Sequence, residues 1–253
     1  MSTIPIALQM YTLRDASSAD FRGTLSKVAE IGYDAIELAG NGGLSASELK
    51  ALLGDLGLQC LGSHTGFEEL EADTQKVIDY NLGIGNPYVV VPWLGEQYRG
   101  DAAGWKAMGA RFAQLGAKLK DAGLTLCYHN HAFEFEVEEN GVPGLDLFYD
   151  NAPADLLAVE LDTYWVKFAG QDPAAYVAKY RDRLPLVHIK DMTAGDAPTF
   201  TEVGTGIMDF PAIFAAAEGG AVKTWIVEQD QTQIDPVESV TISYRNLREL
   251  LGR

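Results

Sequence analysis

All four histidines of the 253-residue chain lie at or just beyond the ends of short apolar runs: His64, His129, His131 and His188. Two acidic residues end similar runs, namely Asp162 and Glu228. Imidazole nitrogens and carboxylate oxygens together form the ligand set that proteins use for Mn²⁺, Zn²⁺, Co²⁺ or Fe²⁺. These residue types therefore predict a divalent-metal site if the fold brings the distant positions together.

The elements that would have to position these side chains alternate regularly along the chain. Runs rich in β-branched residues predict eight strands at residues 6–11, 35–38, 59–64, 88–93, 124–129, 157–162, 186–190 and 225–228, and the fifth runs on towards residue 136. Amphipathic patterns predict helices at about residues 20–31, 45–56, 67–82, 102–122, 145–149, 172–183, 209–217 and 235–251. Strands that alternate with helices indicate a parallel sheet.

Eight such units in 253 residues favour one closed (β/α)₈ TIM barrel over an open doubly wound sheet. Residues 11–15, which come after the first strand, contain no glycine, so a dinucleotide-binding fingerprint is absent there. No linker-like or low-complexity stretch divides the chain, and we expect a single domain over residues 1–253.

The four late strands each end in a possible metal ligand. Active sites of (β/α)₈ barrels lie at the C-terminal ends of the strands, and neighbouring strands are about 4.8 Å apart. We therefore predict that His129, Asp162, His188 and Glu228 converge on one divalent ion (Mn, Zn, Co, Mg or Fe). The alternative is a buried network of hydrogen bonds between imidazoles and carboxylates without metal.

Alternation along a strand adds candidates two residues away on the same face. His131 shares a face with His129, and Lys190 shares one with His188. Glu160 and Asp230 stand in the same relation to Asp162 and Glu228, so each could reach the metal or the substrate.

The candidate catalytic groups are His131, Glu134 and Lys190. His131 or Glu134 would take a proton, and Lys190 or His64 would hold a substrate oxygen. Glu134 lies beyond the strand, and a bulge would be needed to return it to the site; otherwise it is an exposed carboxylate.

Aromatic residues frame the same end of the predicted barrel. Trp93 and Trp165 come after strands four and six, and Tyr11 ends strand one. Such rings stack on the C–H faces of sugars, or simply cap a barrel. Glu37, a charged residue inside the second strand, needs a partner and is a further candidate for substrate binding.

Bulk composition excludes several classes of partner. A net charge of −17 repels phosphate backbones and anionic membranes, so neither nucleic acid nor a membrane is an expected partner. No run of 18 apolar residues and no signal-peptide pattern is present. The two cysteines, Cys60 and Cys127, do not suggest a disulfide framework. A reducing, cytoplasmic location fits these features.

Five segments of the chain resemble the sugar phosphate isomerase/epimerase family, the xylose isomerase-like TIM barrels. They are residues 6–14, 128–135, 160–165, 187–191 and 226–230. The resemblance covers nearly the whole chain and implies a metal ion, with Asp162, His188 and Glu228 in the places of the usual Asp, His and Glu ligands. The fourth ligand in sugar epimerases of this kind is normally a glutamate on strand five, where this chain has His129.

The resemblance implies an enzyme that removes a proton next to a carbonyl of a keto-sugar or cyclitol, as a metal-dependent isomerase or epimerase does. Inosose dehydratases and enzymes acting on 3-keto-glycosides resemble the histidine-rich strand five more closely, which makes a dehydratase or lyase the alternative. A non-catalytic sugar-binding barrel and a metal hydrolase are further alternatives. The expected partner is a small carbohydrate substrate, and an unphosphorylated one is preferred. The sequence is compatible with a homo-oligomer.

Overall fold

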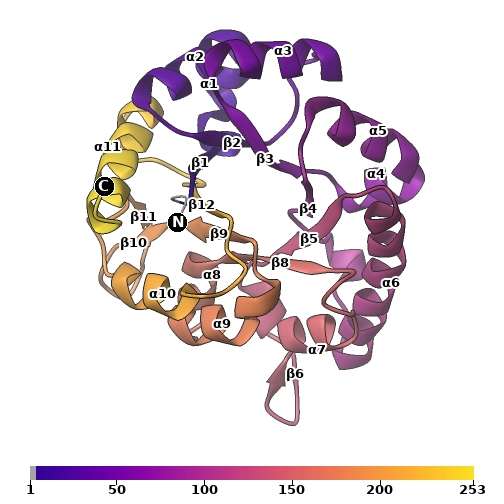
Figure 1. Ribbon diagram of the computed structural model, residues 1–253. Coiled ribbons are helices and arrows are strands. Elements are labelled where there is room, and N and C mark those ends of the chain that lie inside the picture. Colours follow the sequence, from indigo (N-terminus) through magenta and orange to yellow (C-terminus); the bar gives the residue numbers. More distant parts are fainter. Residues whose placement is uncertain (1–3) are drawn as a thin grey trace.

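Eight parallel strands close into a barrel surrounded by helices in the computed structural model, which describes residues 4–253 (Figure 1). The order around the barrel is β1-β12-β9-β8-β5-β4-β3-β2. The strands are β1 (Ile6–Gln9), β2 (Ala35–Leu38), β3 (Gln59–His64), β4 (Tyr88–Val91), β5 (Thr125–His129), β8 (Ala158–Asp162), β9 (Leu186–Ile189) and β12 (Thr224–Val227). The predicted (β/α)₈ barrel is confirmed.

The helices cover the outside of the barrel. They are α1 (Arg14–Ala19), α2 (Phe21–Ile31), α3 (Ala46–Leu56), α4 (Phe67–Ala72), α5 (Thr74–Ile84), α6 (Ala102–Asp121), α7 (Gly144–Asp150), α8 (Thr163–Phe168), α9 (Pro173–Tyr180), α10 (Phe210–Ala217) and α11 (Pro236–Leu250). Two small hairpins lie in the loops, β6 (Glu138–Glu139) with β7 (Val142–Pro143) and β10 (Asp191–Met192) with β11 (Phe200–Thr201).

Helix starts coincide with the capping residues in the sequence. The side chain of Asp20 accepts a hydrogen bond from Gly23 N at the start of α2, and Asp172 and Asp209 act in the same way on α9 and α10. Ser45 and Glu48 form a capping box on α3. Because these caps satisfy backbone N–H groups locally, the sequence alone located these helix starts.

The structure corrects three of the predicted elements and adds one helix. Strand β5 stops at His129, and the chain then turns through a 3₁₀ helix, Phe133–Phe135, instead of running on as a strand towards residue 136. Strand β1 ends at Gln9 in another 3₁₀ helix. The helix predicted over residues 67–82 is broken at Asp73, which caps α5. Helix α8 was not predicted; Asp162, at the end of β8, caps it.

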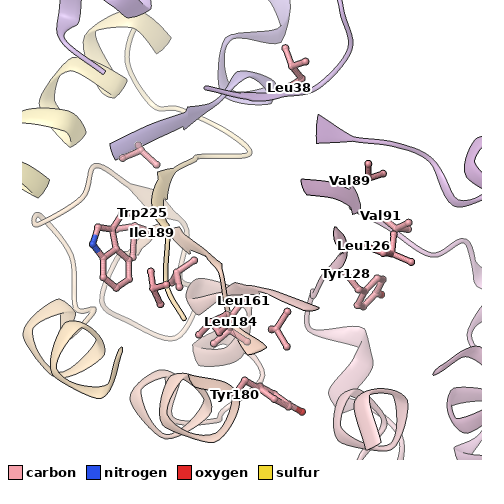
Figure 2. Packing of buried hydrophobic residues seen from close by; sticks show 14 of the residues in the cluster. Leu38, Val89, Val91, Leu126, Tyr128, Leu161, Tyr180, Leu184, Ile189 and Trp225 are labelled. Carbon is pink, nitrogen blue, oxygen red and sulfur yellow. The ribbon is translucent and has the colours of Figure 1, made fainter. Parts of the chain in front are cut away.

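The buried apolar residues form two layers separated by the strands. One large cluster lies between strands and helices, and Figure 2 shows part of it, including Val91, Leu161 and Ile189. A smaller cluster consists of residues that alternate with these: Ala7, Ala35, Val90, Cys127, Ala158, Leu186 and Ile226. The alternation assigns the smaller cluster to the barrel interior.

On six of the strands, the residue two positions after the apolar one is polar. Ala7 is followed by Gln9, Ala35 by Glu37, Cys127 by His129, Ala158 by Glu160, Leu186 by His188 and Ile226 by Glu228. All six polar residues are buried. Since side chains two apart point to the same face of a strand, the strand geometry itself places these polar groups inside the barrel towards its C-terminal end.

Two further observations bear on the sequence predictions. Both cysteines are free and buried, so neither forms a disulfide. Within residues 4–253, no helix combines the length and the apolar character that crossing a membrane requires.

We predict that Gly116→Ala in α6 destabilises the protein by about 1–3 kcal/mol, the usual cost of overpacking a core. A Cβ at this position would lie 1.8 Å from the backbone oxygen of Leu156, which cannot move without displacing the chain that leads into β8. The matched control is Gly54→Ala in α3, where a Cβ would meet no atom within 4 Å and where alanine stabilises a helix by up to about 1 kcal/mol. Urea unfolding of both variants measures the difference, and equal stabilities would contradict the prediction.

Candidate metal centre

The four side chains predicted as metal ligands meet inside the barrel. Donor atoms of His129, Asp162, His188 and Glu228 all lie within 4.8 Å of one another, and all four residues are buried. Oδ2 of Asp162 is buried, lies 3.4 Å from Nε2 of His129, and accepts no hydrogen bond of good geometry. A mixed set of nitrogen and carboxylate oxygen atoms at this spacing fits a divalent cation. We call these four residues the outer group.

Lys190 supplies the fixed positive charge beside the outer group. Its Nζ lies 2.9 Å from Oδ2 of Asp162, 2.7 Å from Oε2 of Glu228 and 2.6 Å from Oδ1 of Asp230. Burial by itself lowers the pKa of this lysine, but the three carboxylates outweigh burial and hold the pKa well above its usual range. Lys190 is therefore an ammonium ion that shares its carboxylates with any metal bound there.

A second set of imidazoles and carboxylates adjoins the outer group. It consists of Glu37, His64, Glu160 and His188, which we call the inner group. His188 belongs to both groups, because Nδ1 lies 2.8 Å from Oε2 of Glu228 and Nε2 lies 2.7 Å from Oε2 of Glu37. Glu37, predicted from its unusual place in a strand to need a partner, has two of them in His64 and His188.

His131 differs from the other three histidines in its surroundings. Its ring packs against aromatic rings, with centroid distances of 4.8 Å to Trp93, 5.6 Å to Phe133 and 5.4 Å to Trp165. Burial, then the neighbouring His129 and Lys190, hold the pKa of this imidazole well below its usual range. Its Nδ1 is buried without a hydrogen-bond partner. His131 is therefore neutral at physiological pH.

Glu134 lies behind His131. The 3₁₀ turn after β5 brings its carboxylate back so that it accepts hydrogen bonds from the hydroxyl of Tyr128 at 2.6 Å and from the backbone N–H of His131 at 2.8 Å. Burial raises the pKa of this carboxyl to about 7, although both hydrogen bonds oppose the shift. The helical turn places this carboxylate against the backbone of His131, so Glu134 is buried and not the exposed carboxylate of the alternative prediction.

A cavity of about 570 Å³ opens above these groups. Its lining includes His64, His129, His131, Lys190, Glu228 and Asp230, together with Tyr11 and Trp93. Trp93 and Tyr11 are about half exposed, at 48% and 44%, and Arg99 lies 4.2 Å from the centroid of the Trp93 ring. Of the other predicted residues, Trp165, Glu134 and Glu37 are not part of this lining.

Two buried residues that position the site were not singled out from the sequence. The amide of Gln9 accepts a hydrogen bond from Tyr11 N and donates one to Oε2 of Glu37 at 2.7 Å. The side chain of Asn130 bonds to both the backbone N–H and the backbone oxygen of Asp162. A polar residue two positions beyond a barrel-facing alanine was the signal for Gln9, but no spacing rule identifies Asn130.

Comparison with known proteins agrees with the architecture. The model of the xylose isomerase-like TIM barrel family matches residues 25–248. An inosose dehydratase of Lacticaseibacillus casei is 24% identical over 204 residues, which is 68% of this chain and 67% of that protein. The rhizopine catabolism protein MocC of Rhizobium meliloti is 22% identical over 266 residues, with 89% of this chain and 80% of that protein covered.

Solved structures give the same fold. A sugar phosphate isomerase/epimerase from Parabacteroides distasonis ATCC 8503 superposes with a TM-score of 0.81 at 26% identity, covering 98% of this chain and 94% of that one. The IOLI protein, whose crystal structure includes a zinc atom, superposes with a TM-score of 0.77 over 98% of both chains. At 13% identity the second likeness concerns the fold alone.

We predict that Glu134→Gln removes a pH dependence of stability. A carboxyl whose pKa is raised on folding, here from 4.5 to about 7, contributes stability that is fully present below the unfolded pKa and is lost as the pH rises through the folded one. Between pH 4.5 and 7.5 the native protein should therefore lose about 3 kcal/mol relative to the variant. Urea unfolding of both proteins at several pH values tests this, and parallel pH profiles would refute it.

Proposed function

The chain belongs to the xylose isomerase-like TIM barrel family, and we propose that it is an enzyme that removes a proton next to a carbonyl of a neutral keto-sugar or keto-cyclitol. The proposal rests on His131, a neutral imidazole that lines the cavity. The other two histidines of the lining, His64 and His129, are each paired with a carboxylate.

His131 is suited to take the proton. A base must be uncharged before it acts, and the lowered pKa keeps this imidazole uncharged at neutral pH. The surrounding rings of Trp93, Phe133 and Trp165 fix its orientation and exclude water. Glu134 was an alternative base; its hydrogen bond to the His131 backbone instead suits a positioning role, and a catalytic role for it stays a prediction.

Lys190 is suited to hold a substrate oxygen. Its ammonium lines the cavity and is fixed by three carboxylates, so it offers positive charge without rearrangement when negative charge develops on the carbonyl oxygen. His64 lines the same cavity and offers a second ring for an oxygen of the substrate. The exposed faces of Tyr11 and Trp93 suit the C–H faces of a sugar or cyclitol ring.

The residues that would hold a divalent metal ion are His129, Asp162, His188 and Glu228. Such an ion, when bound, supplies Lewis-acid polarisation of a carbonyl or hydroxyl oxygen. The crystal structure of the structurally similar IOLI protein contains a zinc atom, which supports a divalent metal ion as the proposed cofactor.

Dehydration is the second candidate reaction. Several sequence relatives are named inosose dehydratase, whereas structural neighbours are named for isomerases and epimerases. Both reactions begin with removal of the proton next to the carbonyl. They differ in the next step: an isomerase or epimerase returns a proton to carbon, and a dehydratase expels a neighbouring hydroxyl as water.

We predict that the metal-loaded protein exchanges the hydrogen next to the carbonyl of an inosose, a 3-keto-glycoside or a ketose in D₂O. His131→Asn should lower the rate by a factor of about 10²–10⁴, the usual worth of a positioned base, without lowering metal content. Proton NMR follows the exchange and identifies the product as an epimer, an isomer or an alkene. Exogenous imidazole should partly rescue His131→Gly, and wild-type exchange by His131→Asn would refute the assignment.

We predict that the exchange activity depends on bound metal. Dialysis against a chelator should abolish exchange, and addition of Mn²⁺ or Zn²⁺ should restore it, because the carboxylates of the outer group are then neutralised and the substrate oxygen is polarised. Asp162→Asn should weaken metal retention, whereas His131→Asn should not. Full activity in metal-free protein would rule out metal dependence, and binding of sugar without exchange would indicate a non-catalytic barrel.

A further inference from the structure

Beneath the outer group lies a complete second ligand set. In the inner group, Nε2 of His64 lies 3.2 Å from Oε2 of Glu37 and 3.0 Å from Oε1 of Glu160. Nε2 of His188 lies 2.7 Å and 3.1 Å from the same two oxygens. Two imidazole nitrogens and two carboxylate oxygens, contributed by β2, β3, β8 and β9, thus face one another in a ring.

The spacing of these atoms suits a small cation. Tetrahedral bonds of about 2.0–2.1 Å to nitrogen and oxygen place neighbouring ligand atoms roughly 3.3 Å apart. The four separations between an imidazole nitrogen and a carboxylate oxygen are 2.7–3.2 Å, a few tenths of an ångström shorter, so these side chains would have to open slightly around an ion. Donor atoms of His64, Glu160, His188 and His129 also lie within 4.8 Å of one another.

The ring nitrogens can serve two ions without sharing. His188 directs Nδ1 to Oε2 of Glu228 at 2.8 Å and Nε2 to the inner group. His129 directs Nδ1 to Oε1 of Glu160 at 2.9 Å and Nε2 to Asp162. A histidine that binds metal through one nitrogen and donates the other N–H to a carboxylate is the usual arrangement at protein metal sites. With both ions bound, His188 would serve the inner ion through Nε2, and His129, Asp162 and Glu228 would hold the outer one.

A hydrogen bond from outside the inner group already orients Glu37. Gln9 donates to Oε2 of Glu37 and is itself fixed by Tyr11 N. Oε1 of Glu37 points at Gly62, where any Cβ would lie 2.2 Å away, so only glycine leaves room for this carboxylate. Glu160 is fully buried, and its Oε2 has no hydrogen-bond partner.

The buried charge of the two groups can accommodate more than one divalent cation. Glu37, Glu160, Asp162 and Glu228 are buried and Asp230 is 25% exposed in its side chain, and Lys190 is the fixed cation that contacts three of these carboxylates. With metal-bound, neutral imidazoles, five carboxylates and one ammonium leave four negative charges to be balanced by metal ions. Without metal, the nearby carboxylates raise the pKa of His64, His129 and His188, so that protons on these rings offset part of this charge. Unpaired buried charge is unfavourable, so this negative charge favours the uptake of cations. One divalent ion removes half of it, and a second removes the rest.

We infer that the protein binds a second divalent cation in the inner group, through Glu37, His64, Glu160 and His188. This site is separate from the single ion of the proposed reaction, and its existence does not depend on which reaction is catalysed. Its role is to neutralise Glu37 and Glu160 and to fix the floor of the cavity.

Metal stoichiometry tests the inference directly. Protein stripped with a chelator and then dialysed against Zn²⁺ should retain two ions per chain by elemental analysis. His64→Asn and Glu160→Gln should each retain one, as should Asp162→Asn in the outer group. His131→Asn is the matched control in the same cavity and should retain two. A wild-type value of one ion, or two ions in His64→Asn, would overturn the inference.

A second measurement needs no variant and so does not depend on whether the variants fold. Wild-type protein loaded with Mn²⁺ alone should give the electron paramagnetic resonance spectrum of two neighbouring, spin-coupled ions. The spectrum of isolated Mn²⁺ at saturation would overturn the inference. Two bound ions in a protein without exchange activity would refute the proposed function but support this site. One bound ion in an active protein would support the proposed function but refute this site.

Discussion

Buried negative charge is the constraint around which the C-terminal half of the barrel interior is arranged. Glu37, Glu160, Asp162 and Glu228 are removed from water by the closed sheet, and removing a carboxylate from water is costly unless a cation or hydrogen-bond donors replace the solvent. Lys190 and the imidazoles are the groups that the chain supplies for this purpose. A bound cation would complete the compensation, which explains why folding and metal binding are expected to be linked here.

The fold concentrates this charge in one layer and isolates it from the rest of the molecule. Below it lies the apolar layer built of residues such as Ala7, Val90 and Ile226. Outside it lies the large cluster between strands and helices, which supplies most of the burial. The apolar layer and the charged layer are therefore separated by only two residues along six of the strands. Strands hold most of the site, and His131, Lys190 and Glu228 lie just beyond strand ends.

The four histidines of the site differ in charge preference because their neighbours differ. His64, His129 and His188 contact carboxylates, whereas His131, two residues beyond His129, packs among aromatic rings. Carboxylates favour the charged imidazole and apolar burial favours the neutral one. One strand and the turn after it thus place His129, the proposed metal ligand, next to His131, the proposed base.

The amino-acid sequence by itself determined the barrel and the identity of the outer group. Local residue patterns predict the strands and helices. Because the barrel strands are parallel, residues at their C-terminal ends, such as His129, Asp162, His188 and Glu228, lie at the same end of the barrel. The family resemblance pointed to the same ligand positions, and the family itself was confirmed.

Only the tertiary structure decided the contacts that depend on exact backbone paths. The turn that ends β5 at His129 and folds Glu134 under the His131 backbone involves no periodic pattern. The same is true of the clamp of Asn130 on Asp162 and of the space that Gly62 leaves for Glu37. The pairing of His188 with Glu37 joins residues 151 positions apart. Sequence periodicity specifies which face of an element is buried, whereas barrel closure and strand stagger decide which buried groups touch.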